Sequence, residues 1–139
     1  MTMIEILVVL AIIGLALSVM PAILTGLDGN RLRAAALEMV ATMREARSRA
    51  TMAEAETDMA LDLERRGYTL STDRVFRPLP AAVGALEVAP AALIGPERIA
   101  RIRFLPDGSA TAARITLRSG ERRATITVNG LTGQVARDG

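Results

Sequence analysis

The chain contains no cysteine, histidine, tryptophan or lysine, and only three aromatic residues among its 139 positions. Without cysteine there can be no disulfide framework, thiol nucleophile or cysteine-ligated metal site. Without histidine, the commonest general base and metal ligand is missing as well. These absences leave few side chains that could act as a nucleophile, a general base or a metal ligand. We therefore expect no enzyme activity, no cofactor and no bound metal.

Charge is unevenly distributed along the chain. All 17 basic residues are arginines and stand against 15 acidic residues, which gives a formal charge of only +2. The first 27 residues hold a single ionisable side chain, Glu5, and the first arginine is Arg31. A chain of this length can form one domain of modest size with an appendage. We predict an apolar segment over residues 1–27 and a globular domain over residues 28–139.

The apolar segment has the length of a membrane span. From Ile6 to Leu27 the chain carries no charge, and 22 helical residues extend about 33 Å, which matches a hydrocarbon core of about 30 Å. Thirteen of these residues are Leu, Ile or Val, and their insertion free energies together outweigh the cost of Glu5. We predict that residues 1–27 form the transmembrane half of a long helix. Gly14 and Pro21 should weaken or kink it, since proline donates no backbone hydrogen bond.

Two other interpretations of this segment fit less well. A cleavable signal peptide needs a basic region at its start, and nothing basic precedes Arg31. A buried core helix is rarely apolar on every side for six turns. The positive-inside rule would nevertheless place Arg31 and Arg33 in the cytoplasm, because the other flank has no basic residue. We therefore expect that the sequence is incomplete at its start.

The pattern after Gly29 is amphipathic and then becomes strand-like. Apolar residues at helical spacing predict a helix over residues 28–53 with one buried face, formed by Leu32, Ala36, Met39, Val40, Met43, Ala46 and Ala50. From residue 56 onward the period changes to two, with a turn expected at Gly67 and Tyr68. Residues 77–97 are rich in proline and predict a long loop with one short strand near residues 86–88.

The last third of the chain predicts three antiparallel strands, each buried on one face. Small and branched apolar residues alternate with Arg and Thr; the apolar members are Ala100, Ile102, Phe104, Ile115, Leu117, Ala124, Ile126 and Val128. Pro106, Asp107 and Gly108 supply a turn. The expected fold class is α+β, with a long N-terminal helix packed on a C-terminal antiparallel β domain of two small sheets or a sandwich.

The first residues resemble the mature N-terminus of type IV pilins and pseudopilins. "MTMIE" followed by "ILVVLAIIGLAL" places Glu5 at the position and spacing that this superfamily uses. Met1 stands where the family usually has Phe. The resemblance implies that a prepilin peptidase removes a short basic leader, that the new amine of Met1 is methylated, and that Glu5 is an assembly contact.

The C-terminal part is similar to a narrower group. "FLPDGSATAARITL" and "ITVNGLTGQVA" resemble the last strands of H-type minor pseudopilins of type II secretion and of related minor pilins. The resemblance implies a structural subunit in the bacterial inner membrane, a single-pass protein whose C-terminal domain lies in the periplasm. Its partners would be major and minor pseudopilins of one filament, which helps export folded proteins. The alternative is a minor pilin of a type IV pilus, with or without DNA binding.

Nucleic acid is not an expected partner, although arginines of the predicted strands offer one possible binding surface. Six arginines of the predicted strands could share one outward face and contact phosphates: Arg101, Arg103, Arg114, Arg118, Arg122 and Arg123. No aromatic residue lies among them for base stacking. The candidate groups for an enzyme are Ser109 and Ser119 in turns and three acids on one strand, Asp58, Asp62 and Glu64. No nucleophile, phosphate-binding or metal-ligand motif surrounds them.

Overall fold

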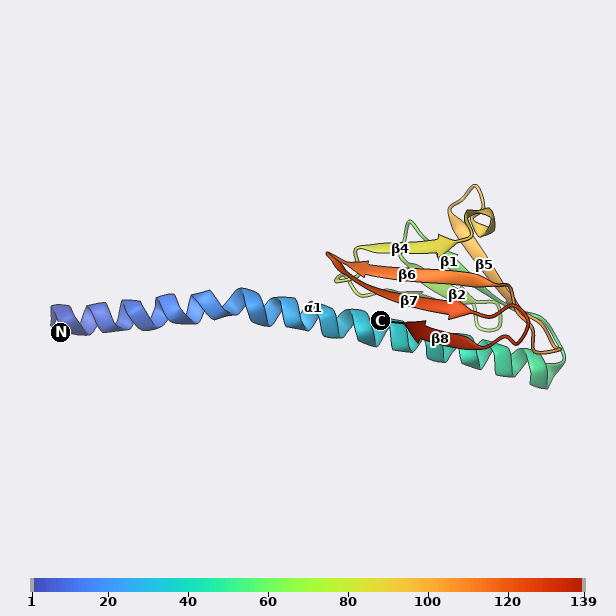
Figure 1. Ribbon diagram of the computed structural model, residues 1–139, viewed down its shortest axis with the longest axis horizontal. Helices are drawn as coiled ribbons and strands as arrows, with labels where there is room; N and C mark the ends of the chain where they lie inside the picture. The colour runs from blue at the N-terminus through green and yellow to red at the C-terminus, as the bar shows by residue number, and fades with distance from the viewer. Residues whose placement is uncertain (1, 139) are drawn as a thin grey trace.

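The computed structural model describes residues 2–138, except for the side chains of residues 19–28. One long helix is followed by eight strands and a short 3₁₀ helix (Figure 1). The elements are α1 (Met3–Ala53), β1 (Thr57–Asp62), β2 (Gly67–Leu70), β3 (Phe76–Pro78), β4 (Ala85–Ala89), η1 (Ala91–Leu93), β5 (Ile99–Phe104), β6 (Ala113–Ser119), β7 (Arg122–Val128) and β8 (Val135–Asp138). This order places the helix before an all-antiparallel β region, as the α+β prediction required.

The helix α1 is 51 residues long and is assigned as one continuous element. Thr2 caps its start with an extended backbone, and its side-chain oxygen accepts a hydrogen bond from the backbone N–H of Glu5. Glu54 ends the helix in the left-handed conformation, with φ of 52°. The predicted end at residue 53 is confirmed. The N-terminal half of α1 projects away from the β region, whereas the C-terminal half lies along it (Figure 1).

The strands form two four-stranded antiparallel sheets. The first has the order β3-β2-β1-β5 and the second the order β4-β6-β7-β8. In the first sheet Met59 of β1 lies opposite Leu70 and Ile102 of its two neighbours. In the second, Ile115 of β6 lies opposite Ile126 of β7 and Val88 of β4. These cross-strand pairs place branched apolar side chains on the inner faces.

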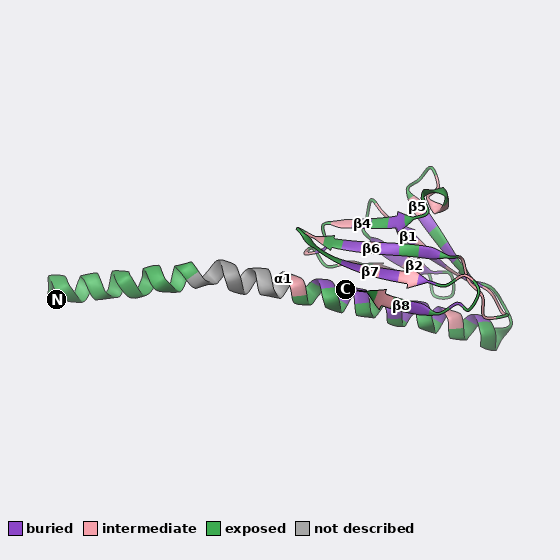
Figure 2. Cartoon of the chain, in the orientation of Figure 1, coloured by how far each residue is buried: buried purple, intermediate pink, exposed green. Residues whose placement is uncertain are grey.

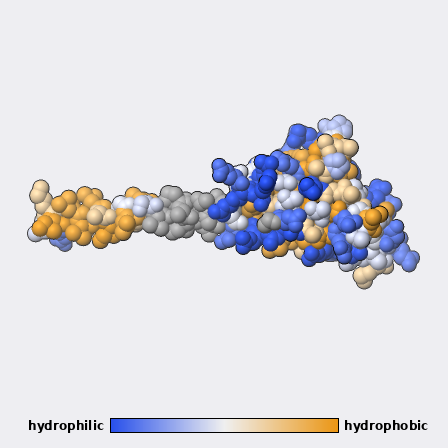
Figure 3. All heavy atoms as spheres, viewed as in Figure 1, coloured by the Kyte–Doolittle hydropathy of each residue, from blue (hydrophilic) through white to orange (hydrophobic). Residues whose placement is uncertain are grey.

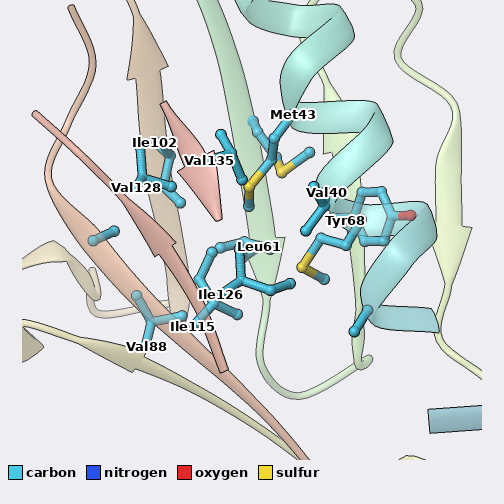
Figure 4. Packing of buried hydrophobic residues seen from close by; sticks show 14 of the residues in the cluster. Val40, Met43, Leu61, Tyr68, Val88, Ile102, Ile115, Ile126, Val128 and Val135 are labelled. Carbon is cyan, nitrogen blue, oxygen red and sulfur yellow. The ribbon is translucent and has the colours of Figure 1, made fainter. Parts of the chain in front are cut away.

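The core lies between the two sheets and the C-terminal half of α1. Every apolar residue predicted to face inward from the helix and the last strands is buried. Figure 2 shows the buried positions concentrated on the side of α1 that faces the strands. Figure 4 shows Met43 and Val40 of the helix pointing toward Leu61 of the first sheet and Ile126 of the second. Each such fully buried side chain contributes roughly 1.5–3 kcal/mol of transfer free energy.

The structure corrects two details of the sequence-based prediction and supplies a third. Tyr68 and Gly67 belong to β2, where Tyr68 is buried, and not to the turn before it. The three predicted C-terminal strands are divided between the two expected sheets, since β5 pairs with β1 while β6 and β7 pair with each other. The proline-rich region contains the expected short strand as β4, but it is preceded by β3, which was not predicted.

Candidate assembly site

The N-terminal turn of α1 positions the carboxylate that sequence motifs marked as an assembly contact. Glu5 lies in the first helical turn and is exposed. Its backbone N–H is held by the carbonyl and hydroxyl oxygens of Thr2, at 3.1 and 3.4 Å. A carboxylate is favoured at this end of a helix, where unpaired N–H groups concentrate positive charge. Met1, the predicted methylation site, lies outside the described residues.

The described part of the helix beyond Glu5 is apolar and exposed. From Ile6 to Leu17 its large side chains are exposed by 70% at Leu15 to 46% at Val9, and none is buried against the β domain. Figure 3 shows the outer part of this projecting segment as mostly hydrophobic. Gly14 has no neighbouring atoms that an added side chain would meet. Pro21 and Leu27, two of the predicted transmembrane positions, lie outside the residues whose side chains are described.

Residues 1–27 were predicted to be the membrane-spanning half of this helix. No helix in the described part of the chain has both the length and the apolar character of a membrane span. Ile6 and Gly14 do lie on the exposed apolar segment, as the prediction placed them. The geometry therefore establishes an exposed apolar helical surface over residues 3–17.

Two arginines near the other end of α1 hold the C-terminal loops against the helix. Arg44 donates a hydrogen bond to the carbonyl oxygen of Val135 at 3.0 Å. Arg47 donates to the carbonyl oxygen of Thr132 at 2.9 Å and to that of Gly108 at 3.4 Å. Sequence analysis did not single out either arginine. The three-residue spacing of Arg44 and Arg47 places both on one side of the helix. Their partners could not be predicted from the sequence, because they lie 61 to 91 residues away.

The loops that these arginines contact contain both of the short C-terminal motifs. In the "PDG" turn, the carboxylate of Asp107 accepts hydrogen bonds from the N–H and hydroxyl of Ser109, which lower its pKa. In the "LTG" loop, the side-chain oxygen of Asn129 accepts from the N–H groups of Leu131 and Thr132. Both are side-chain-to-backbone turns that fix a loop locally. The two motifs are thus neighbours in space and have a structural role.

Three of the candidate groups for catalysis make structural contacts, and a fourth, Ser119, is the last residue of β6 instead of lying in a turn. Asp58 forms an ion pair with Arg103 at 2.9 Å, across the β1–β5 pair. The carboxylate of Asp62 accepts from two backbone N–H groups of the following turn, and Glu64 lies in that turn instead of on the strand. Ser109 donates its hydroxyl hydrogen to Asp107. Within the described residues, no group of three or more potential ligands gathers to hold a metal ion.

The six strand arginines, which could have shared one outward face, are divided between the two sheets. Arg101 and Arg103 lie on β5 of the first sheet. The other four lie on β6 and β7 of the second sheet: Arg114, Arg118, Arg122 and Arg123. Arg118 is also paired with Glu87 at 3.2 Å. Periodicity places Arg123 on the outer side of β7 and Arg122, one residue earlier, on the opposite side, and it carried no information on which sheet each strand would join.

A long helix whose apolar half projects from a small domain of two antiparallel sheets defines a pilin-like subunit. A family model described as "Type II transport protein GspH" matches residues 35–132. Type II secretion system protein H of Xanthomonas campestris pv. campestris is 30% identical over 135 residues, which cover 96% of this chain and 79% of that protein. The chain therefore belongs to the GspH family, as its sequence motifs predicted.

Solved structures support the same fold. The type IV minor pilin FimU of Pseudomonas aeruginosa matches with a TM-score of 0.59 and 14% identity, over 79% of this chain and 90% of that one. The minor pseudopilin EpsH from the type 2 secretion system of Vibrio cholerae matches with a TM-score of 0.59 and 12% identity, over 78% and 96%. At these identities the likeness concerns the fold alone.

Proposed function

We propose that this chain is a structural minor pseudopilin of a type II secretion system, a subunit of the short periplasmic filament that helps export folded proteins across the outer membrane. Membership of the GspH family supports this role. The observation that carries the proposal is the exposed apolar half of α1, joined to a small β domain. Eleven large apolar side chains of residues 3–17 are exposed, and a soluble monomer rarely leaves a patch of this size uncovered.

Two environments cover this apolar surface in turn. Before assembly, residues 1–27 anchor the subunit in the inner membrane as a single-pass span, with the C-terminal domain in the periplasm. After extraction from the bilayer, the apolar helices of neighbouring major and minor pseudopilins surround it. An apolar helix face is stabilised comparably by lipid tails and by other apolar side chains, so the exchange requires little hydrophobic free energy.

Glu5 directs this exchange. A carboxylate among apolar side chains is costly unless a positive group pairs with it. No basic side chain lies in residues 1–27, so the available cations are N-terminal amines. Maturation by a prepilin peptidase would create such an amine, methylated at Met1, on every subunit. The amine of the adjacent subunit is then the partner of Glu5, and the pair strengthens as water is excluded.

A minor pilin of a type IV pilus remains the second candidate, because FimU has the same fold with an equal TM-score. DNA binding is not favoured for it here, since the strand arginines are divided between two sheets. Deletion of the gene distinguishes the two candidates. A pseudopilin predicts loss of exported proteins from the culture medium with pilus function intact, and affinity-tagged chain should recover pseudopilins. Loss of pilus function with normal secretion would overturn the proposal.

A further inference from the structure

A cleft rich in arginine lies where the projecting half of α1 meets the β domain. It has a volume of about 460 Å³. Its lining includes Gly29 and the polar residues Asn30, Arg33, Arg122, Arg123 and Arg137. We call it the arginine cleft. Its residues come from α1, from the start of β7 and from β8, so the fold brings them together over about 90–110 residues of sequence. Figure 3 shows hydrophilic residues gathered at this end of the domain.

The cleft has the chemistry of an anion site. Four guanidinium groups line it, and none of its described lining residues is acidic. Asp28, which precedes Gly29, has a side chain outside the described residues. The Arg122 guanidinium lies so close to Gly29 that an added Cβ there would collide with it. Arginine is the residue best suited to phosphate, because its planar fork donates two parallel hydrogen bonds.

Arg33 and Arg123 are the two members best placed to receive a ligand. Both are exposed, and neither makes an ion pair with another described residue. Arg33 lies on α1 one turn after Gly29, and Arg123 lies on β7 next to Arg122. The remaining two, Arg122 and Arg137, already have interactions within the chain and add positive potential to the cleft.

The position of the cleft along the helix indicates that its phosphate ligand belongs to a lipid headgroup. If residues 6–27 span the bilayer, about 33 Å of helix crosses a hydrocarbon core of about 30 Å. Gly29 and Arg33 then follow within about two turns of the end of the span, at the depth of the lipid headgroups. The proposed topology also exports these arginines against the positive-inside rule. Attraction to anionic lipid, about 1 kcal/mol per basic residue near the surface, would favour that position.

We propose that the arginine cleft binds the phosphate group of an anionic phospholipid through Arg33 and Arg123, and so holds the globular domain on the membrane before assembly. This inference rests on the membrane anchorage proposed above. It adds a second, ionic attachment to the apolar one. Subunits entering the filament must release it, which makes lipid charge a control on assembly.

The test uses full-length chain purified in a neutral detergent, with lipid binding measured by native mass spectrometry. The probes are phosphatidylglycerol and phosphatidylcholine with identical acyl chains, so that only the headgroup differs. We compare wild type, Arg33→Gln with Arg123→Gln, and a matched control, Arg101→Gln with Arg114→Gln, which removes the same charge from positions outside the cleft. Circular dichroism should show the same fold for all three, because each substituted side chain is exposed.

Wild type and the control should both prefer phosphatidylglycerol, whereas the cleft variant should bind it about 30-fold more weakly. Equal weakening in the control, or no headgroup preference in wild type, would overturn the proposal. So would unchanged lipid preference together with loss of partner pseudopilins, which would assign the cleft to a protein. Binding of inorganic phosphate without headgroup preference would also reject the lipid.

Membrane insertion is read separately, by alkaline extraction of membranes that contain each variant. A wild-type chain that does not insert, or that recovers no pseudopilins, counts against the proposed function. Loss of headgroup preference in a chain that inserts normally counts only against the cleft. Because lipid binding is measured in detergent, this second result does not depend on insertion into a bilayer.

Discussion

Arg47 of α1 donates a hydrogen bond to the backbone carbonyl oxygen of Thr132, across 85 residues of sequence. The contact connects the last turns of the helix to the loop between β7 and β8. The same guanidinium reaches the carbonyl oxygen of Gly108, in the turn after β5. One side chain thus joins the helix, the first sheet and the second sheet at the end of the domain farthest from the arginine cleft.

The β domain should fold without the projecting half of the helix. Removal of residues 1–28 leaves the buried stripe from Leu32 to Ala50 in place, and residues 2–18 bury nothing against the strands. We expect a soluble, monomeric domain with one cooperative thermal transition in circular dichroism. A broad, non-cooperative transition would mean that the apolar half contributes to the fold itself.

Arg47→Ala should destabilise this truncated domain by about 1–3 kcal/mol, because two carbonyl oxygens lose a charged donor. The matched control is Arg49→Ala in the same helix. Arg49 forms an ion pair with Glu45 at 2.6 Å, but both side chains are about half exposed, so its loss should change stability by less than about 1 kcal/mol. Urea unfolding of both variants gives the comparison. Equal effects would show that Arg47 does not hold the loops.

Gly133→Ala should be more harmful than Gly120→Ala, although both glycines have positive φ, 70° and 62°. An added Cβ at Gly133 would collide with the carbonyl oxygen of Gly108 and with the Arg47 side chain, whereas at Gly120 it meets nothing. The backbone penalty of about 1–2 kcal/mol is common to both. Thermal melts should therefore show an additional loss at Gly133 only, and similar melting temperatures would contradict the close approach.

The parts of the fold that were predictable depend on local periodicity. The buried stripe of α1 repeats with the helical period, and Ile102, Ile115 and Ile126 alternate with polar residues as strand neighbours do. These patterns locate a buried face without knowledge of what covers it. The helix end was predictable for the same reason, because the period changes from helical to alternating just after residue 53.

The parts that escaped prediction depend on contacts between distant residues. Strand β5 pairs with β1, more than 35 residues earlier, and no local pattern distinguishes that partner from β6. Glycine often marks a turn, but here residues 63–66 already form the turn. Gly67 and Tyr68 therefore begin strand β2. Arg44, Arg47 and the arginine cleft likewise need the folded chain, since each joins the helix to the last strands.

Tyr68 should titrate above its ordinary pKa of 10.0 in the folded domain. Burial is the main cause, and the charge of Glu38 adds to it, while a hydrogen bond with Thr42 acts in the opposite direction. A phenol whose folded pKa is raised favours folding fully below pH 10, and this stability is lost as pH rises from there toward the folded pKa. The chain has one tyrosine and no tryptophan, so tyrosinate absorbance reports this group alone. The urea-unfolded domain is the control, and identical titration of both states would reject the prediction.

Glu5→Leu should separate membrane insertion from assembly. Glu5 is the one charged side chain in residues 1–27, so its replacement leaves insertion unchanged or improves it. Assembly should suffer, because the amine of the adjacent subunit would then enter an apolar environment unpaired, at a cost of about 3–5 kcal/mol. We expect recovery of partner pseudopilins with the tagged chain to fall at least tenfold.

Two further variants serve as controls for this result. Glu5→Gln, which keeps the size but not the charge, should lose partners as Glu5→Leu does, whereas Glu64→Gln in the exposed turn after β1 should recover partners normally. Insertion and recovery are measured on the same membrane preparation. A Glu5→Leu chain that inserts and still recovers its partners at the wild-type level would show that Glu5 is not the assembly contact.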